Sequence, residues 1–226
     1  MIKSAGGEAS FVTCDVTKAV DVEAMVARAV ELYGGLDYAF NNAGIGPDGN
    51  RFPVVPVAEC PEEIWDRTLD INLKGVFLCC QTVGKGMIEQ GGGKIINISS
   101  AAAVNGEQGF LAYCVSKSGV MMLTRVLAYE WSKHNITVNA IAPGFVAAGM
   151  NTPILNKEML VSGLSNRVPL KRLGQPEEIV KVALFLASED SAYINGTTIV
   201  ADGGMAGYSP TGFIDLIAEM KKKASK

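Results

Sequence analysis

Short apolar runs alternate with longer helical patterns along this chain, and this alternation limits the possible folds more than any other feature of the sequence. Strands alternating with helices, and apolar on both of their own faces, are typical of a parallel sheet covered by helices on both sides. The 226 residues contain no internal repeat, linker or low-complexity block. We therefore predict an α/β fold with a doubly wound parallel sheet in a single domain, residues 1–226. The predicted strands are 10–16, 36–44, 94–100, 136–144 and 197–204, and the predicted helices are 19–35, 62–90, 110–133 and 176–188.

Composition argues against several classes of protein. The formal net charge is −3, and the only cationic run, Lys221–Lys223, is expected to be a solvated helix end, so no basic face for nucleic acid is expected. The five cysteines are odd in number and lack Cys-x-x-Cys spacing, which argues against a disulfide framework and a structural metal site. No apolar run reaches the length of a membrane span, and the first residues lack the pattern of a signal peptide. The sequence predicts a cytoplasmic protein that binds neither nucleic acid nor membrane.

A tyrosine and a lysine lie four residues apart in the stretch AYCVSKSG, so Tyr113 and Lys117 share one face of a predicted helix. Thirteen residues earlier, Ser100 ends a predicted strand. Asn72 lies inside another predicted helix, where asparagine is a poor helix former and needs a specific reason. Both a catalytic and a core-packing role are open for Tyr113, as are a chemical and a structural role for Asn72.

These four residues occur in order with several further motifs, and the whole set resembles the short-chain dehydrogenase/reductase family over essentially the full chain. The resemblance implies a Rossmann-like fold and NAD(P)-dependent interconversion of an alcohol and a carbonyl on a small molecule. The further motifs are NNAG at 41–44, PG at 143–144, GQPEEI at 174–179 and ADGG at 201–204.

The family resemblance also implies roles for the four residues. Tyr113 would be the catalytic acid/base, Lys117 its electrostatic partner and the anchor of the nicotinamide ribose, Ser100 the ligand of the substrate oxygen, and Asn72 the support of a proton relay. The four-residue spacing agrees with this chemistry. The ordinary tyrosine pKa near 10 is too high for proton transfer near neutral pH, so a catalytic tyrosine needs a positive charge beside it. A nearby positive charge favours the phenolate, so we expect Lys117 to lower the pKa of Tyr113.

The expected cofactor is NAD or NADP, bound beyond the carboxyl ends of the strands. Asn41 is expected to hold its strand in place, and a cap at the end of a strand is the alternative role for Asp15. By resemblance, the cofactor-binding residues are Asp15, Val16, Asn42, Ala43, Gly44, Tyr113, Lys117, Pro143, Gly144 and Val146.

The sequence departs from the family at two places. Ala148 stands where the family usually has a threonine beside the nicotinamide carboxamide, so a side-chain hydrogen bond there would need Thr152 to reach back. The family's first two strands and its glycine-rich phosphate loop have no counterpart before residue 10, and GIGPDG at 44–49 is a false match because prolines follow it. Without those strands, 10–16 would pair beside the next strand, pair with another chain or be poorly ordered; a natural start upstream of Met1 is a further explanation.

Two functions follow as hypotheses. The first is an alcohol/carbonyl oxidoreductase, in a shortened form whose activity is uncertain. The second is a non-catalytic subunit of the same family that acts in oligomerisation or binding. In both cases we expect a homo-oligomer, a dimer or a homotetramer, formed through the 110–133 and 62–90 helices and the last strand. The lid over the substrate is expected between Phe145 and Arg172, and the sequence does not identify the substrate.

Overall fold

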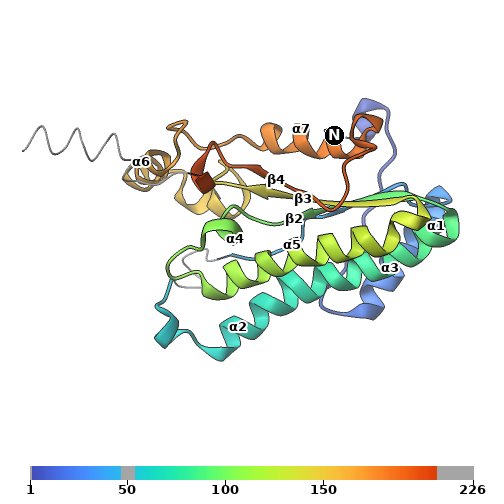
Figure 1. The fold of residues 1–226 in the computed structure, drawn as a ribbon, viewed down its shortest axis with the longest axis horizontal. Coiled ribbons are helices and arrows are strands. Elements are labelled where there is room, and N and C mark those ends of the chain that lie inside the picture. Colours follow the sequence, from blue (N-terminus) through green and yellow to red (C-terminus); the bar gives the residue numbers. More distant parts are fainter. Residues whose placement is uncertain (1, 47–53, 208–226) are drawn as a thin grey trace, which may run out of the picture.

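The structure is a computed structural model that describes residues 2–46 and 54–207. The Lys221–Lys223 run and the last part of GIGPDG lie outside these residues. The described part contains one sheet of four parallel strands in the order β1-β2-β3-β4, which confirms the predicted α/β class (Figure 1). The strands are β1 (Tyr38–Asn41), β2 (Gly93–Ile98), β3 (Ile136–Pro143) and β4 (Thr198–Ala201).

Helices cover both faces of the sheet, as Figure 1 shows: α3 and α5 lie on one face and α7 on the other. Each face has its own buried apolar cluster, one centred on Val120, Val138 and Met87 and one on Ile141 and Leu186. The helices are α1 (Ala19–Tyr33), α2 (Glu62–Leu69), α3 (Gly75–Gln90), α4 (Ala102–Asn105), α5 (Leu111–Trp131), α6 (Glu158–Arg167) and α7 (Pro176–Ala187). Short 3-10 helices are η1 (Lys3–Ala5), η2 (Val57–Glu59), η4 (Ser132–His134), η5 (Gly149–Ile154), η6 (Glu189–Ser191) and η7 (Met205–Gly207).

The predicted helix 62–90 is two helices joined by a single wide turn. The turn is η3 (Asp70–Lys74), a π-helix, and it contains Asn72. Such π-bulges are frequent at functional sites, because the extra residue re-aims side chains without ending the helix. The sequence marked this position only through an asparagine that suits a helix interior poorly.

Buried polar side chains connect the sheet to the helices behind it. Asn41 donates through Nδ2 to Asn97 Oδ1 at 2.9 Å, and Asn97 in turn donates to the Thr124 hydroxyl of α5 at 3.0 Å. Asn97 and Thr124 are both fully buried. Because buried amides are costly unless they are hydrogen-bonded, this chain of bonds fixes the register of β1, β2 and α5. The prediction that Asn41 holds its strand in place is confirmed.

The prediction of a buried strand at 10–16 is wrong. These residues form an irregular segment with no strand pairing, and Phe11 is 88% exposed. An extended segment is a stable strand only when a neighbour takes its backbone N–H and C=O groups, and none of the four described strands lies beside this one. The segment is held instead by local contacts, such as the hydrogen bond from Tyr33 Oη to Ser10 Oγ at 2.9 Å.

Candidate active site

A cavity of about 720 Å³ opens at the carboxyl ends of the strands, where a doubly wound sheet places its ligands. Residues from the ends of β1, β2 and β3, from α5 and α7, from the loops after β1 and β3, and Met205 of η7 form its walls. This volume lies within the range that protein pockets for small molecules and cofactors occupy. The cavity brings together these residues predicted from sequence: Asn42, Gly44, Ser100, Tyr113, Lys117, Pro143, Gly144 and Val146.

Tyr113 lies in the first turn of α5, where its ring packs edge-on against Phe110 with the ring centroids 6.4 Å apart. Lys117 Nζ lies over the same ring, 6.0 Å from its centroid, so the two side chains face each other as predicted. Burial raises the pKa of the Tyr113 phenol, although a hydrogen bond with the Ser100 hydroxyl acts to lower it. The expected lowering of this pKa by Lys117 is therefore wrong for the structure, because desolvation of the phenolate outweighs the other effects.

Lys117 is nearly fully buried, with 2% of the residue exposed. Its Nζ donates to the backbone oxygen of Ile98 at 2.9 Å, and its own backbone oxygen accepts a hydrogen bond from Ser99 Oγ at 2.8 Å. Burial lowers the pKa of the ammonium from 10.5 to about 8, because the charged form loses its water. One of the three ammonium hydrogens is used by Ile98, which leaves two donors for a ligand in the cavity.

The low pKa of Lys117 predicts a pH dependence of stability. Between pH 8 and 10.5 the unfolded chain keeps the Lys117 proton and the folded chain releases it, so the free energy of unfolding rises with pH in this window. Relative to that of Lys117→Met, the free energy of unfolding of the wild-type protein should increase by about 3 kcal/mol between pH 7 and 10.5, as measured by urea unfolding. Lys133→Met, on the exposed η4 turn, is the matched control: it retains Lys117 and should show the same gain as wild type. A pH-independent difference between wild type and Lys117→Met would contradict the prediction.

Asn72 lies directly behind the cavity and is fully buried. Its Oδ1 accepts from the N–H of Ile45 at 2.7 Å, and its Nδ2 donates to the Ile45 oxygen at 2.8 Å and to Ser116 Oγ at 3.2 Å. The side chain therefore holds the turn after β1 by both of its backbone groups and ties that turn to α5. This contact supports the structural alternative for Asn72; the proton relay stays a prediction.

Gly44 leaves room for Asn72 and Lys117 to converge. A Cβ on Gly44 would lie 3.1 Å from Asn72 Oδ1 and 3.3 Å from Lys117 Nζ. Even a methyl group there would require Asn72 or Lys117 to shift slightly, so the glycine of NNAG is explained by close packing around these two side chains. The Asn42 side chain, the Lys117 donors and the Ser99–Ser100 segment then present hydrogen-bonding groups along one wall, which suits the ribose and amide of a nicotinamide cofactor.

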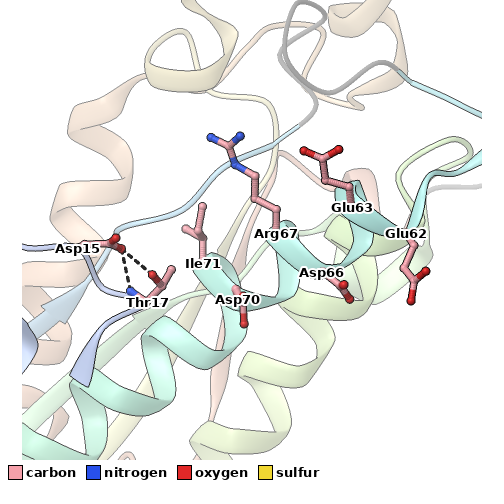
Figure 2. Close-up of a pocket in the computed structure, with 8 residues that line it drawn as sticks. All are labelled: Asp15, Thr17, Glu62, Glu63, Asp66, Arg67, Asp70 and Ile71. Atoms are coloured by element: carbon pink, nitrogen blue, oxygen red, sulfur yellow. Dashed lines mark hydrogen bonds between the residues drawn. The ribbon is translucent and has the colours of Figure 1, made fainter. Parts of the chain in front are cut away.

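Three predicted cofactor residues, Asp15, Val16 and Ala43, do not line this cavity. Asp15 lines a separate open groove of about 690 Å³ beside α2, shown in Figure 2. Its Oδ1 accepts hydrogen bonds from the backbone N–H and the hydroxyl of Thr17, and these bonds lower the pKa of the carboxyl. Val16 packs against α3, since a Cβ on Gly75 would lie 2.8 Å from Val16 Cγ2. Asp15 therefore stabilises a local turn with Thr17, and its contact with a cofactor stays a prediction.

Several residues of the cavity wall were not identified from the sequence. Met150 lies against Gly46, where a Cβ would approach its sulfur to 2.7 Å, and so stands close to Tyr113. Asn151 lines the cavity and donates to the Val146 oxygen at 2.8 Å, whereas Thr152 is exposed and does not reach back toward Ala148. Glu107 lines the cavity from the loop before α5. No periodicity or spacing marked these positions, because they belong to loops that only the fold brings together.

The described residues contain neither a cluster of metal ligands nor a membrane-spanning helix. Within residues 2–46 and 54–207, no group of three or more His, Cys, Asp or Glu side chains could hold a metal ion. Over the same part of the chain, no helix has both the length and the apolar character needed to cross a membrane.

Comparison with known proteins gives consistent matches. The sequence model of a family described as enoyl-(acyl carrier protein) reductase matches residues 1–206. An uncharacterized oxidoreductase of Thermotoga maritima is 40% identical over 208 residues, which are 90% of this chain and 80% of that protein. The 2-dehydro-3-deoxy-D-gluconate 5-dehydrogenase of Escherichia coli is 40% identical over 85% of this chain and 74% of its own length. The crystal structure of a gluconate 5-dehydrogenase from Burkholderia cenocepacia, in complex with NADP and tartrate, superposes with a TM-score of 0.84 at 31% identity, over 92% of this chain and 79% of that one.

Proposed function

This chain belongs to the short-chain dehydrogenase/reductase family, and on that premise we propose that it is an NAD(P)-dependent oxidoreductase that interconverts an alcohol and a carbonyl of a small molecule. The observation that carries the proposal is the convergence of Tyr113, Ser100 and Lys117 at one cavity. The Ser100 hydroxyl acts to lower the pKa of the phenol, and the Lys117 ammonium lies over the phenol ring. Three groups at this spacing can bind and protonate one substrate oxygen.

The chain's own residues account for the proton and for the position of the oxygen. Ser100 donates to the substrate oxygen and holds it within reach of the phenol. Tyr113 is protonated near neutral pH because its pKa is raised, so it gives its proton to a carbonyl oxygen during reduction and recovers it during oxidation. A bound nicotinamide cofactor, NAD or NADP, supplies or accepts the hydride. Lys117 would hold the cofactor ribose with its two remaining donors, and Asn42, Gly44, Pro143, Gly144 and Val146 would contact the cofactor in the same cavity.

Cofactor binding is the direct test of this proposal. Addition of 1 mM NADH or NADPH should raise the melting temperature by several degrees, because a ligand at 100 times its Kd stabilises a protein by about 2.7 kcal/mol. ATP at the same concentration controls for nonspecific anion binding. A melting temperature that is unchanged by both reduced cofactors would reject the catalytic function and favour a non-catalytic subunit. Of the two cofactors, the one with the larger shift is the preferred one.

The same proposal includes a homo-oligomer in the cytoplasm, a dimer or a tetramer. One apolar stripe of α5 is exposed in the single chain, with Val115 at 39%, Met122 at 55% and Val126 at 45% exposed. Such a stripe on a long helix fits an interface with a second copy. A monomeric mass by light scattering would reject the oligomer. The five cysteines are all free, which fits a reducing compartment.

A further inference from the structure

Glu107 is a carboxylate in the wall of the catalytic cavity, and the family-like motifs do not include it. It lies in the loop between α4 and α5, seven residues after Ser100 and six before Tyr113. Its backbone oxygen accepts the N–H of Phe110 at 3.1 Å, which fixes the loop as a turn, and only 19% of its side chain is exposed. A carboxylate in this position is a fixed part of the cavity, because its backbone is held and its side chain is largely covered.

Arg167 holds the Glu107 side chain from the outer side. Arg167 Nη2, at the end of α6, donates to Glu107 Oε2 at 2.5 Å. The guanidinium also lies over the ring of Phe145, 5.4 Å from its centroid, and Phe145 lines the cavity whereas Arg167 does not. The arginine thus holds one oxygen of the carboxylate without itself lining the cavity. A substrate in the cavity meets the carboxylate, whose second oxygen, Oε1, has no hydrogen-bond partner among the described residues.

The charges of the cavity wall limit what this substrate can be. Among the described lining residues, Glu107 is the only acidic one and Lys117 the only basic one. Lys117 already donates to the Ile98 oxygen, and under the proposed function it also binds the cofactor. An ionised carboxylate accepts hydrogen bonds but donates none. It therefore favours a substrate hydroxyl and repels a substrate carboxylate in the same place.

We propose that Glu107 is a specificity-determining residue that accepts a hydrogen bond from a hydroxyl of a neutral substrate and discriminates against a substrate that has a carboxylate in the same position. The proposal rests on the proposed function only for the position of the substrate. It sets this chain apart from relatives whose names specify gluconate or a gluconate derivative.

D-Glucitol and D-gluconate test this proposal, because they have the same length and differ at C1, where one has a hydroxymethyl group and the other a carboxylate. Their Kd values are measured by ligand-observed NMR at pH 7 and equal ionic strength, with and without NADH, for wild type and Glu107→Gln. Wild type should bind glucitol about 10-fold more tightly than gluconate. Glu107→Gln keeps an acceptor but removes the charge, so this ratio should fall to about 3-fold or less. Glu31→Gln is the matched control, since it removes the same charge from an exposed ion pair with Arg28 on α1, and it should keep the wild-type ratio.

These Kd measurements test the specificity proposal separately from the proposed function, because a ligand can bind without being oxidised or reduced. A chain that binds glucitol selectively but oxidises no alcohol retains the specificity proposal and loses the oxidoreductase. The specificity proposal is overturned if wild type binds gluconate as tightly as glucitol, if it binds neither at 50 mM, or if Glu107→Gln and Glu31→Gln give the same ratio. The Arg167→Gln variant tests whether the arginine, and not the glutamate, contacts the substrate. If wild type preferred gluconate and Arg167→Gln lost this preference, Arg167 would be an anion-binding residue and the proposal would be wrong. If Glu107→Gln does not fold, the ratio of the gluconate and glucitol Kd values of wild type still tests the proposal, because equal values would overturn it.

Discussion

Replacing Tyr113 by phenylalanine is expected to lower kcat by about 10²- to 10⁴-fold, with a folded protein that still binds cofactor. The substitution removes one oxygen from the first turn of α5 and leaves the ring packed against Phe110 and under Lys117. It removes the only group that the proposed mechanism uses to move a proton to the substrate oxygen. Steady-state rates, followed at the absorbance of the reduced cofactor, measure the loss, and circular dichroism checks the fold.

Tyr129→Phe is the control for this experiment. Tyr129 lies on the same helix, and the residue is 85% exposed and far along the chain from the cavity wall. Its phenol should be replaceable with less than a 2-fold change in kcat. A Tyr113→Phe variant with near wild-type activity would show that another group moves the proton, and the catalytic proposal for Tyr113 would fail.

The raised pKa of Tyr113 adds a pH signature to the same experiment. Alcohol oxidation needs the phenol deprotonated, so the wild-type oxidation rate should rise with pH above neutrality, whereas carbonyl reduction uses the protonated form. The residual activity of Tyr113→Phe should lack this rise. This difference separates a proton-transfer role from a purely structural one, which would leave the pH profile unchanged.

Replacing Asn72 by alanine is expected to destabilise the fold by about 2–4 kcal/mol. The side chain makes three hydrogen bonds in a fully buried position, two of them to the backbone of Ile45. Alanine would leave the two Ile45 backbone groups without this partner, and the lost solvation of each costs free energy, whereas the Ser116 hydroxyl keeps its hydrogen bond to the Tyr113 oxygen. Urea unfolding measures the change as a lower midpoint at a similar slope.

Asn105→Ala is the matched control for Asn72. Asn105 makes one hydrogen bond, from Nδ2 to the Met205 oxygen at 3.2 Å, in an exposed environment, so alanine there should cost about 0.5 kcal/mol or less. If both alanine variants had the same midpoint, Asn72 would not be the structural support of the β1 turn. The alternative role in a proton relay would then be the better explanation of this residue.

The elements with strong apolar periodicity were predictable from the sequence. The strands β1 to β4 and the helices α1, α5 and α7 lie where the pattern of apolar residues and turn residues placed them, because each buries its apolar side chains in a cluster on one face of the sheet. The facing of Tyr113 and Lys117 was also predictable, since residues four apart share a helix face. Local spacing was enough in each of these cases.

Neighbours distant in sequence decided the rest. Residues 10–16 have the composition of a strand, but a strand also needs a partner for its backbone, and the described sheet provides none there. The Tyr113 pKa moves upward because the closed packing of the site desolvates the phenol, an effect that no residue spacing reveals. Glu107 and Arg167 meet across 60 positions of sequence. The sequence by itself thus determined the class of fold and the pair of groups at its centre, through patterns within one helix or strand. The tertiary structure alone decided how buried those groups are and which loop residues line the cavity, because burial and ion pairing depend on contacts between segments.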